Sequence, residues 1–538
     1  MHRRLRGWRS VVLAAVLASA VSLVVPPPVG SAPPEDGHGS HVAGIGLDEP
    51  PGAPRSTPIP HLVRPGSERR PARSAVGEAS TREAGPLAPV VLPPGAFDGA
   101  PDLAGASPAD PTGALGITNH VAAVNVHMAT FDRTGAPQFT DPKRLRSLDE
   151  QLPSGVQDFD PKVVYDPYDG VFLLTFASAS ATQSFLSIVV IPEGTEDDET
   201  QDGWCTLHMS GDQVAGDGKQ MADYPSLGFT SNRVTLSTNQ YEFDGALPEP
   251  FRYVQIVSMR KAHLYDCTVN PVPIDVFSRS QTRDPDGSRA FTIVPAISNG
   301  GDPAVQYLAS LDANASTGKL ILWRLRSVDG ALRLGRSQVA SQTMRLPPFG
   351  LQCGGSLSNR NTWWDTGDLR LTSAFWDADL GRLYTATAIK GNRGGGPIES
   401  LVKWWEVDPA TRLSNSDVTR SGKVGAAGRD SAWPSVATDA DGNVWLNYAG
   451  AGLDECLSAY AAVVHPTERS AEQAVYRVGE ARYEFSTGDP ERWGDYTAIA
   501  RDPVVPTTVA VYGAYPLDVG AGATTDVWQQ VIATLDDV

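Results

Sequence analysis

The chain has 538 residues, of which 41% are hydrophobic and 20% are charged, and its formal net charge at pH 7 is −18. Because an acidic chain repels phosphate backbones, this charge argues against nucleic acid as a partner. Acidity suits the binding of hard cations such as calcium, although a well-solvated surface is the simpler explanation.

The N-terminus has the order of a secretory signal peptide. Residues 1–10 contain four arginines and no acid, and a 15-residue apolar run follows from Val11 to Val25, before the small residues Gly30 and Ala32. This order predicts a signal peptide over residues 1–32; the alternative is an uncleaved anchor, for which the run is short. No later stretch is long and apolar enough to span a bilayer, so we expect a secreted, extracellular chain without a membrane span after cleavage.

Residues 33–95 are rich in proline, glycine, serine and charge, and they contain no aromatic residue. Such a segment cannot bury enough apolar surface to offset the entropy of ordering it. The sequence therefore predicts a disordered linker over residues 33–95 and a folded domain over residues 96–538.

The folded part is predicted to be all-β and repetitive. Short runs rich in Val, Tyr, Thr and Trp alternate with Asp/Gly/Asn turns, and helical periodicity is missing. One unit, a strand followed by a tight turn and a second strand, recurs along the chain. Its clearest copies are WPSVATDADGNVWLNYAG, DPKVVYDPYDGVFLLTFAS, YPSLGFTSNRVTLSTNQ and VPAISNGGDPAVQYLASLD, which begin at Trp433, Asp160, Tyr224 and Val294.

Looser copies begin at Asp368 and Asp495, and a weak copy begins at Pro111. Seven copies with four short strands each predict a seven-bladed β-propeller, with six or eight blades as the alternatives. We expect the final run, DVWQQVIAT, to supply the last strand and help to close the ring. The equivalent positions, separated by 48 to 74 residues, are Ala114, Lys162, Ser226, Ala296, Arg370, Ser435 and Ala498.

Asp-Gly pairs mark several of the tight turns. Asp169-Gly170, Asp379-Leu380-Gly381 and Asp441-Gly442 each stand between two strand-like runs. Glycine tolerates the positive φ that a tight hairpin needs, and aspartate supports such a turn by local hydrogen bonds. We interpret these pairs as hairpin turns.

The chain has four cysteines, Cys205, Cys267, Cys353 and Cys456. An even number in an exported chain favours two disulfides over a redox or metal site. Three pairings are possible, and we expect neighbours to pair, as Cys205–Cys267 and Cys353–Cys456.

Several segments between about residue 108 and residue 516 resemble those of a known group of proteins; they include DPTGALGITNHVAAVN, DFDPKVVYDPYDG, ADYPSLGFTSN and RWGDYTAIARDP. In these segments the sequence resembles secreted bacterial and fungal β-propellers related to the sialidase-like superfamily, many of which have no assigned activity. The resemblance implies the fold and leaves the activity open, because one fold hosts many functions.

One sialidase motif, the Asp-box, has the pattern Ser/Thr-x-Asp-x-Gly-x-x-Trp/Phe. Thr438, Gly442 and Trp445 match it, but Ala440 stands at the aspartate position. A Phe/Tyr-Arg-Ile-Pro segment, which supplies a carboxylate-binding arginine in sialidases, is missing from the sequence.

The residues just before the first strand of each unit are expected to ring one mouth of the central channel. Carboxylates, tryptophan faces and arginines suit a polyhydroxylated ligand, and converging carboxylates could also hold calcium. The alternative is structural, because aspartates often cap turn amides and tryptophans often fill the space between blades. The candidate ligand-binding residues are Asp158, Asp160, Asp223, Trp364, Asp365, Asp368, Arg429, Asp430, Trp433, Arg492, Trp493 and Asp495, with Asp110, Tyr224 and Trp363 in the same ring.

Two functions follow from this ring. The first is a monomeric extracellular propeller that binds a glycan or protein at the channel mouth without catalysis. The second is a sialidase-like glycoside hydrolase or lyase that uses two of the carboxylates. Because the sequence identifies neither a catalytic residue nor a definite cofactor, whether the chain is an enzyme stays open at this point, and calcium is the one cofactor considered.

Overall fold

The computed structural model describes residues 95–536, except for residues 104, 215–219, 244–250, 301–304, 313–318, 340–343, 393–397, 410–416, 469, 486–489 and 521–523. The predicted signal peptide, and the predicted linker except for Gly95, lie outside the described residues. Within the described part of the chain, no helix has both the length and the apolar character needed to cross a membrane.

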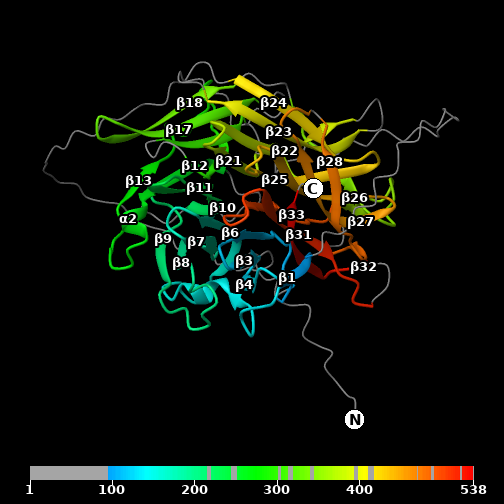
Figure 1. The fold of residues 1–538 in the computed structure, drawn as a ribbon, viewed down its shortest axis with the longest axis horizontal. Helices are drawn as coiled ribbons and strands as arrows, with labels where there is room; N and C mark the ends of the chain where they lie inside the picture. Colours follow the sequence, from blue (N-terminus) through cyan, green and yellow to red (C-terminus); the bar gives the residue numbers. More distant parts are fainter. Residues whose placement is uncertain are drawn as a thin grey trace, which may run out of the picture. The chain divides into compact units, whose positions relative to one another are not determined.

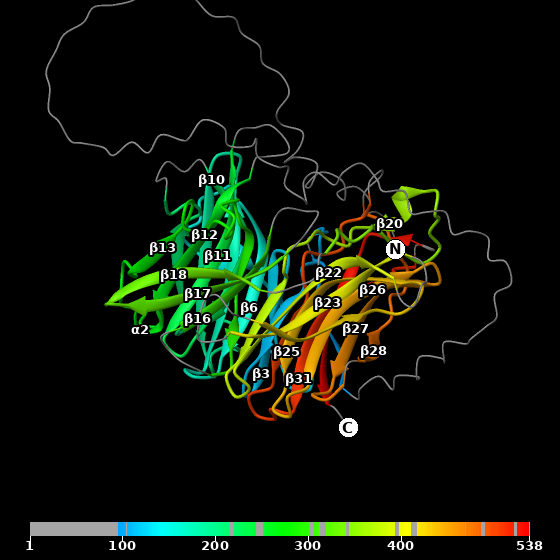
Figure 2. The ribbon, with the colours of Figure 1, turned by 90° about the horizontal axis from the view of Figure 1, so that it is seen from above.

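The described residues form a seven-bladed β-propeller, which confirms the predicted fold (Figures 1 and 2). The first three blades are antiparallel sheets whose strands follow one another in chain order. They consist of β2 (Thr112–Leu115), β3 (Asn119–Val124), β4 (His127–Asp132) and β5 (Lys143–Arg144); β6 (Gln157–Asp166), β7 (Val171–Ala179), β8 (Ser184–Pro192) and β9 (Cys205–Ser210); and β10 (Gln220–Phe229), β11 (Arg233–Glu242), β12 (Phe251–Arg260) and β13 (Ile274–Phe277).

The next three blades follow the same plan, and the short strand β15 (Ile297–Ser298) adds in parallel to β21 in the fifth. They consist of β14 (Phe291–Pro295), β16 (Val305–Leu311), β17 (Leu320–Val328) and β18 (Ala331–Gln338); β21 (Ser373–Asp377), β22 (Arg382–Gly391), β23 (Glu399–Asp408) and β24 (Asp417–Val424); and β25 (Arg429–Thr438), β26 (Val444–Gly452), β27 (Glu455–Val464) and β28 (Glu472–Arg477).

The seventh blade joins the two ends of the described chain. Its order from the inside outwards is β30 (Ala498–Arg501), β31 (Thr508–Pro516), β33 (Trp528–Asp536) and β1 (Phe97–Pro101). The run DVWQQVIAT is therefore the third strand, and the N-terminal strand β1 is the fourth. Each innermost strand contacts the innermost strand of the next blade, and β30 contacts β2, so the ring is closed.

Short elements lie in the loops within and between the blades. These are the helical turns η1 (Leu145–Leu148), α2 (Lys261–Leu264) and η2 (Arg360–Thr362), and the two-stranded pairs of β19 (Gly350–Leu351) with β20 (Trp363–Trp364) and of β29 (Arg482–Tyr483) with β32 (Thr524–Thr525).

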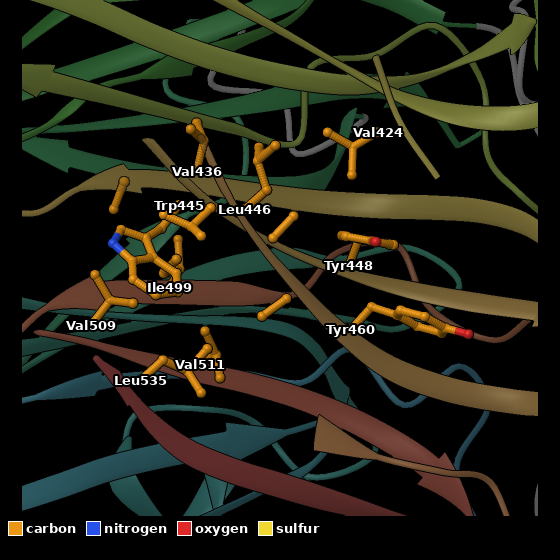
Figure 3. Close-up of a cluster of buried hydrophobic side chains, with 14 of the residues drawn as sticks. Val424, Val436, Trp445, Leu446, Tyr448, Tyr460, Ile499, Val509, Val511 and Leu535 are labelled. Carbon is orange, nitrogen blue, oxygen red and sulfur yellow. The ribbon is translucent and has the colours of Figure 1, made fainter. Parts of the chain in front are cut away.

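Composition changes from the inner to the outer strands because neighbouring blades cover both faces of the inner ones. The strand β26, VWLNYAGAG, is buried at every position, whereas the outermost strand of the same blade, β28, EQAVYR, is partly exposed. A strand covered on both faces reads as a nearly continuous apolar run. The hydrophobic clusters accordingly lie between blades; Figure 3 shows one, in which Val436, Leu446 and Ile499 pack together.

The predicted Asp-Gly turns are confirmed as hairpin turns between the first and second strands of their blades. Gly170, Gly381 and Gly442 have φ values of 63°, 62° and 82°, which residues other than glycine rarely adopt. At the third turn, the Asp439 carboxylate accepts hydrogen bonds from the backbone amides of Asp441 and Asn443 and from the Trp445 indole. The capping carboxylate therefore lies one residue before Ala440, which occupies the aspartate position of the Asp-box pattern.

Both predicted disulfides are confirmed. Cys205–Cys267 ties β9 of the second blade to the loop before β13, and Cys353–Cys456 ties the loop after β19 to β27. They close loops of 62 and 103 residues.

Replacing either pair of cysteines by serine should lower the free energy of unfolding, by about 2–4 kcal/mol, since cross-linking loops of this length restricts the unfolded chain. Denaturation melts of the two double variants, with and without a reducing agent, check this. Reduction should lower the stability of the wild type and of each variant that keeps one bridge, and an unchanged melt after loss of a bridge would contradict the expectation.

Candidate functional site

The site is built on a β-bulge that recurs in the innermost strands. In β6, β10, β14 and β25 the register of pairing shifts by one residue, and a residue other than glycine adopts a positive φ at each shift. Asp110, just before β2, has the same backbone conformation. Bulges with strained residues of this kind occur near functional sites. The bulged residues are Asp110, Asp160, Tyr224, Thr292 and Trp433.

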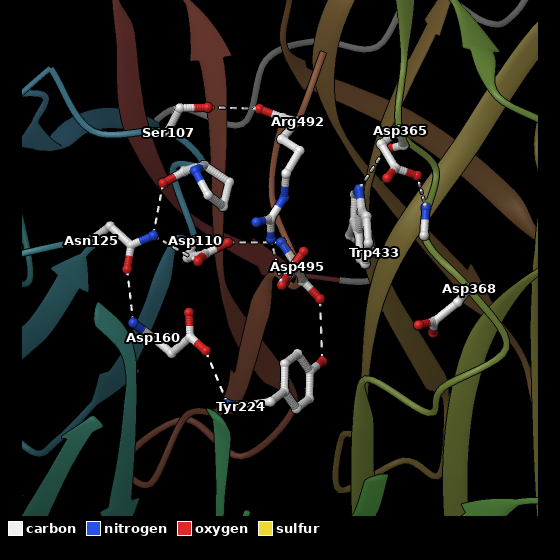
Figure 4. A network of polar contacts seen from close by, with 12 residues as sticks. Ser107, Asp110, Asn125, Asp160, Tyr224, Asp365, Asp368, Trp433, Arg492 and Asp495 are labelled. Atoms are coloured by element: carbon white, nitrogen blue, oxygen red, sulfur yellow. Dashed lines mark hydrogen bonds and ion pairs between the residues drawn. The ribbon is translucent and has the colours of Figure 1, made fainter. Parts of the chain in front are cut away.

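Side chains of neighbouring blades satisfy the backbone amides around these bulges (Figure 4). Asp110 accepts the Asp495 amide at 2.7 Å and the Asn125 side-chain amide at 2.7 Å. Asn125 accepts the Asp160 amide at 2.8 Å, and Asp160 accepts the Tyr224 amide at 3.0 Å. The Tyr224 hydroxyl then donates to the Asp495 carbonyl at 3.2 Å. The network therefore links four blades, and Asp110 and Asp160 have structural roles in it.

Two arginines face this network. Arg492 Nη2 lies 2.9 Å from Asp495 Oδ2, and the arginine side chain is 57% exposed. Arg370 pairs with the buried Asp368 through both Nε and Nη2, each 3.0 Å from the carboxylate, and its guanidinium lies 4.4 Å from the centre of the Tyr224 ring. Paired guanidinium–carboxylate contacts of this kind are strong and directional.

The aspartates differ in protonation. Burial alone would raise the pKa of Asp495, but the Arg492 and Arg370 guanidiniums hold it below its ordinary value. Burial, and then the charge of Asp495, raise the pKa of Asp160 to about 6. Burial and the same carboxylate raise the pKa of Asp110 well above its ordinary value.

Asp223 is the exception among these carboxyl groups. Its side chain is partly exposed, and it has no hydrogen-bond or ion-pair partner among the residues that the structure describes. Burial, and then the charge of Asp160, raise its pKa to about 8. At neutral pH it is therefore a protonated carboxyl group with both a donor and acceptors to offer.

Lys162 lies beside the same carboxylates. Its ammonium is 2.9 Å from the centre of the Tyr496 ring and 5.5 Å from that of Tyr224. Burial lowers its pKa to about 7, against the opposing charges of Asp110 and Asp160.

The structure brings together part of the predicted ring. We define the charged cluster as Asp110, Asp160, Asp223, Arg370, Arg492 and Asp495. Asp368 adjoins the charged cluster through its ion pair with Arg370. Asp365 also adjoins it, because the charge of Asp495 and, to a smaller extent, that of Asp365 raise the pKa of Arg492. Trp433 borders it and donates from its indole to the Asp365 carbonyl at 3.1 Å.

Other predicted ring residues are engaged elsewhere. Trp364 and Trp493 are buried in a hydrophobic cluster, where their faces are not open to a ligand. Arg429 pairs with Asp454 and Glu455 at the β26–β27 turn.

Two of the predicted aspartates cap distant backbone amides. Asp430 accepts the Leu351 and Ser400 amides at 2.9 Å each, and Asp158 accepts the Arg146 amide at 3.3 Å. Both carboxylates are buried.

The sequence-based ring left out Lys162 and Arg370, although both mark repeat positions. The sequence does distinguish these two residues, because they stand at the repeat position where other copies have the small polar residues Ser226 and Ser435. A long cation at that register indicates a charge inside the channel.

A potential metal site lies away from the charged cluster. In the described parts of the chain, His465, Glu468 and Glu472 place ligand atoms within 4.8 Å of one another, between β27 and β28. All three residues are partly or fully exposed, and His465 also contacts Asn443.

Comparison with known proteins found no matching family model and no matching curated protein. Among solved structures, a protein of unknown function from Dyadobacter fermentans is 12% identical, with a TM-score of 0.36 over 71% of this chain and 100% of the other. A Hadza microbial sialidase is 11% identical, with a TM-score of 0.36 over 78% and 74% of the two chains. The α-L-arabinofuranosidase of Fusarium graminearum is 10% identical, with a TM-score of 0.35 over 79% and 92%. The structural neighbours of this chain thus include glycoside hydrolases.

Proposed function

We propose that the chain is an extracellular glycan-binding propeller whose ligand contacts the charged cluster at the channel mouth. The observation that carries the proposal is that Asp223 and Arg492 keep unused hydrogen-bonding capacity beside a network that is otherwise satisfied. A protonated carboxyl and an exposed guanidinium together match hydroxyl groups, which both donate and accept. Two disulfides suit an oxidising location.

The charge balance favours a neutral ligand. Arg370 and Arg492 offset Asp368 and Asp495. Burial raises the pKa of Asp110 and of Asp223, and the ammonium of Lys162 lies near Asp160, whose pKa is about 6. A neutral, polyhydroxylated ligand avoids the cost of placing an unpaired charge in such a site. Since Tyr224, Tyr496 and Trp433 are all buried, recognition would depend on hydrogen bonds more than on ring stacking.

Binding is favoured over catalysis because Asp110 and Asp160 hold backbone amides in the network between blades. One observation favours hydrolysis as the second candidate. The pKa of Asp223 is raised and that of Asp495 is lowered. In glycosidases, two carboxyl groups whose pKa values are shifted in opposite directions serve as the acid and as the base or nucleophile.

A screen of neutral oligosaccharides, followed by calorimetric titration of the best ligand, tests the proposal. Arg492→Ala should weaken binding at least tenfold, the size expected for loss of a charged hydrogen bond. Wild-type affinity should fall above pH 8 as Asp223 loses its proton, whereas Asp223→Asn should bind with little dependence on pH.

Arg252→Ala is the matched control, because Arg252 is also exposed and pairs with Glu242. Release of reducing ends by the wild type, abolished in Asp223→Asn, would establish the hydrolase in place of the binding protein. If no glycan is bound or cleaved, both candidates fail.

A further inference from the structure

The opposite end of the channel contains a cavity of about 260 Å³, which we call the distal cavity. It lies at the C-terminal ends of the innermost strands, whereas the charged cluster lies near their N-terminal ends. Its walls are mainly apolar and come from several blades. Leu115, Val164, Phe229, Ile297 and Ile499 line it, with Arg501, Asn299, Asp379 and Asp502 among its polar residues. Asp502 is paired with Arg133.

Two polar residues of the distal cavity, Arg501 and Asn299, make long contacts through their side-chain N–H groups. Arg501 Nη1 lies 3.7 Å from Asp379 Oδ2, and Arg501 Nε lies 3.3 Å from the Pro506 carbonyl. The Asn299 side-chain amide lies 3.4 Å from Asp377 and 3.5 Å from Asp379. Good N–H···O bonds are near 2.9 Å, so these donors have capacity for a closer acceptor.

A ligand could replace Asp379 at little cost. The Asp379 side chain is 76% exposed, while that of Arg501 is 15% exposed. An ion pair with so exposed a partner contributes little to stability. The Arg501 guanidinium is thus a partly desolvated cation, and its present partner, the Asp379 carboxylate, can rotate away from it into the solvent.

Exposed apolar residues lie around the distal cavity, beside polar ones such as Asp379. Ile117, Leu380, Val504 and Val505 are exposed on the turns between first and second strands, at the end of the blades where the cavity opens. Residues of the same β30–β31 turn, such as Pro506, line the cavity itself. An apolar wall with few polar groups is typical of small-molecule sites.

We propose that the distal cavity is a second binding site, which takes a small carboxylic acid with an apolar body. The carboxylate would accept from Arg501 and Asn299, and the body would lie against Val164, Ile297 and Ile499. An apolar cavity of about 150 Å³ holds benzene, so the distal cavity has room for one ring and a short acidic chain.

Calorimetric titration with 3-phenylpropanoate at pH 7 tests this site, with 3-phenylpropanol as the neutral counterpart. The wild type should bind the acid saturably at one site and the alcohol at least tenfold more weakly. Arg501→Gln should weaken binding of the acid about tenfold or more, as expected for loss of a charged hydrogen bond, and should leave the alcohol nearly unchanged. Ala500→Leu, which fills the cavity from β30, should weaken both ligands.

Arg252→Gln should bind both ligands as the wild type does, because Arg252 pairs with Glu242 away from the cavity. Saturable binding that survives both Arg501→Gln and Ala500→Leu would place the ligand elsewhere and overturn the proposal, as would no binding by the wild type. The probe is measured apart from any glycan, so failure of the glycan proposal leaves this result standing.

Discussion

Replacing Asp223 with asparagine is expected to raise the thermal stability of the protein, and to raise it more at pH 8 than at pH 5. The folded-state pKa of Asp223 is about 8, against about 4 for an unfolded aspartate. A carboxyl group with a raised folded pKa contributes its full stability below the unfolded pKa, and that stability is lost as pH rises toward the folded pKa. The loss is at most about 1.4 kcal/mol per pH unit between pH 4 and pH 8, a few kcal/mol in total. Asparagine has the same shape and avoids this cost.

Denaturant melts of wild type and Asp223→Asn at pH 5, 6, 7 and 8 measure the difference. Asp368→Asn is the matched control of opposite sign, since it removes the buried partner of Arg370 and should destabilise the fold by about 3–5 kcal/mol. If Asp223→Asn lowered stability by a similar amount at every pH, Asp223 would have a structural partner in the folded protein and would not be free for a ligand.

Much of the fold was predictable because each blade repeats the same strand, turn and strand. Lys162, Ser226 and Ser435 proved to be equivalent, each following a bulge by two residues. In the other two copies the residues equivalent to these, two positions after Asp110 and Thr292, are Thr112 and Val294. The predicted positions, Ala114 and Ala296, are therefore two residues too late. The error arose because sequence similarity aligned the apolar runs, whereas the bulge sets the backbone register.

The sequence did not predict β1, the outermost strand of the seventh blade. β1 follows a proline-rich segment and contains Gly99 and Pro101, so its composition resembles a loop. It is a strand because the free edge of β33 pairs with it, and that pairing is an effect of tertiary structure.

The candidate site was predictable in position but not in membership. Asp160 and Asp495 could be placed at the channel mouth from their position before an inner strand. Asp430 has the same local sequence position, yet it caps Leu351 and Ser400, which lie 79 and 30 residues away. Such long-range partners depend on the packing of whole blades, so local sequence cannot separate a capping aspartate from one that is free for a ligand.

A chain that begins at residue 102 and therefore lacks β1 is expected to be much less stable than a chain that begins at Gly95. β1 pairs with β33 through Phe97 and Asp98, and the Phe97 ring lies 5.5 Å from that of His120 and 5.6 Å from that of Phe131 in the first blade. It thus joins the last blade to the first. Phe97 is partly buried, so its loss costs up to about 3–5 kcal/mol, and each lost hydrogen bond costs about 1 kcal/mol. Together these losses correspond to a melting temperature roughly 5–10 °C lower.

Thermal melts of the full chain and the two shortened chains measure this effect. The full chain and the chain from Gly95 should melt together if residues 1–94 are the predicted signal peptide and linker. The chain from residue 102 should also aggregate more readily, because the edge of β33 is left open to pairing. A synthetic peptide of residues 95–103 should restore part of the lost stability, since it can occupy that edge in trans. If the chain from residue 102 melted at the same temperature as the chain from Gly95, β1 would not close the ring, and the stability of the propeller would depend on contacts between blades alone.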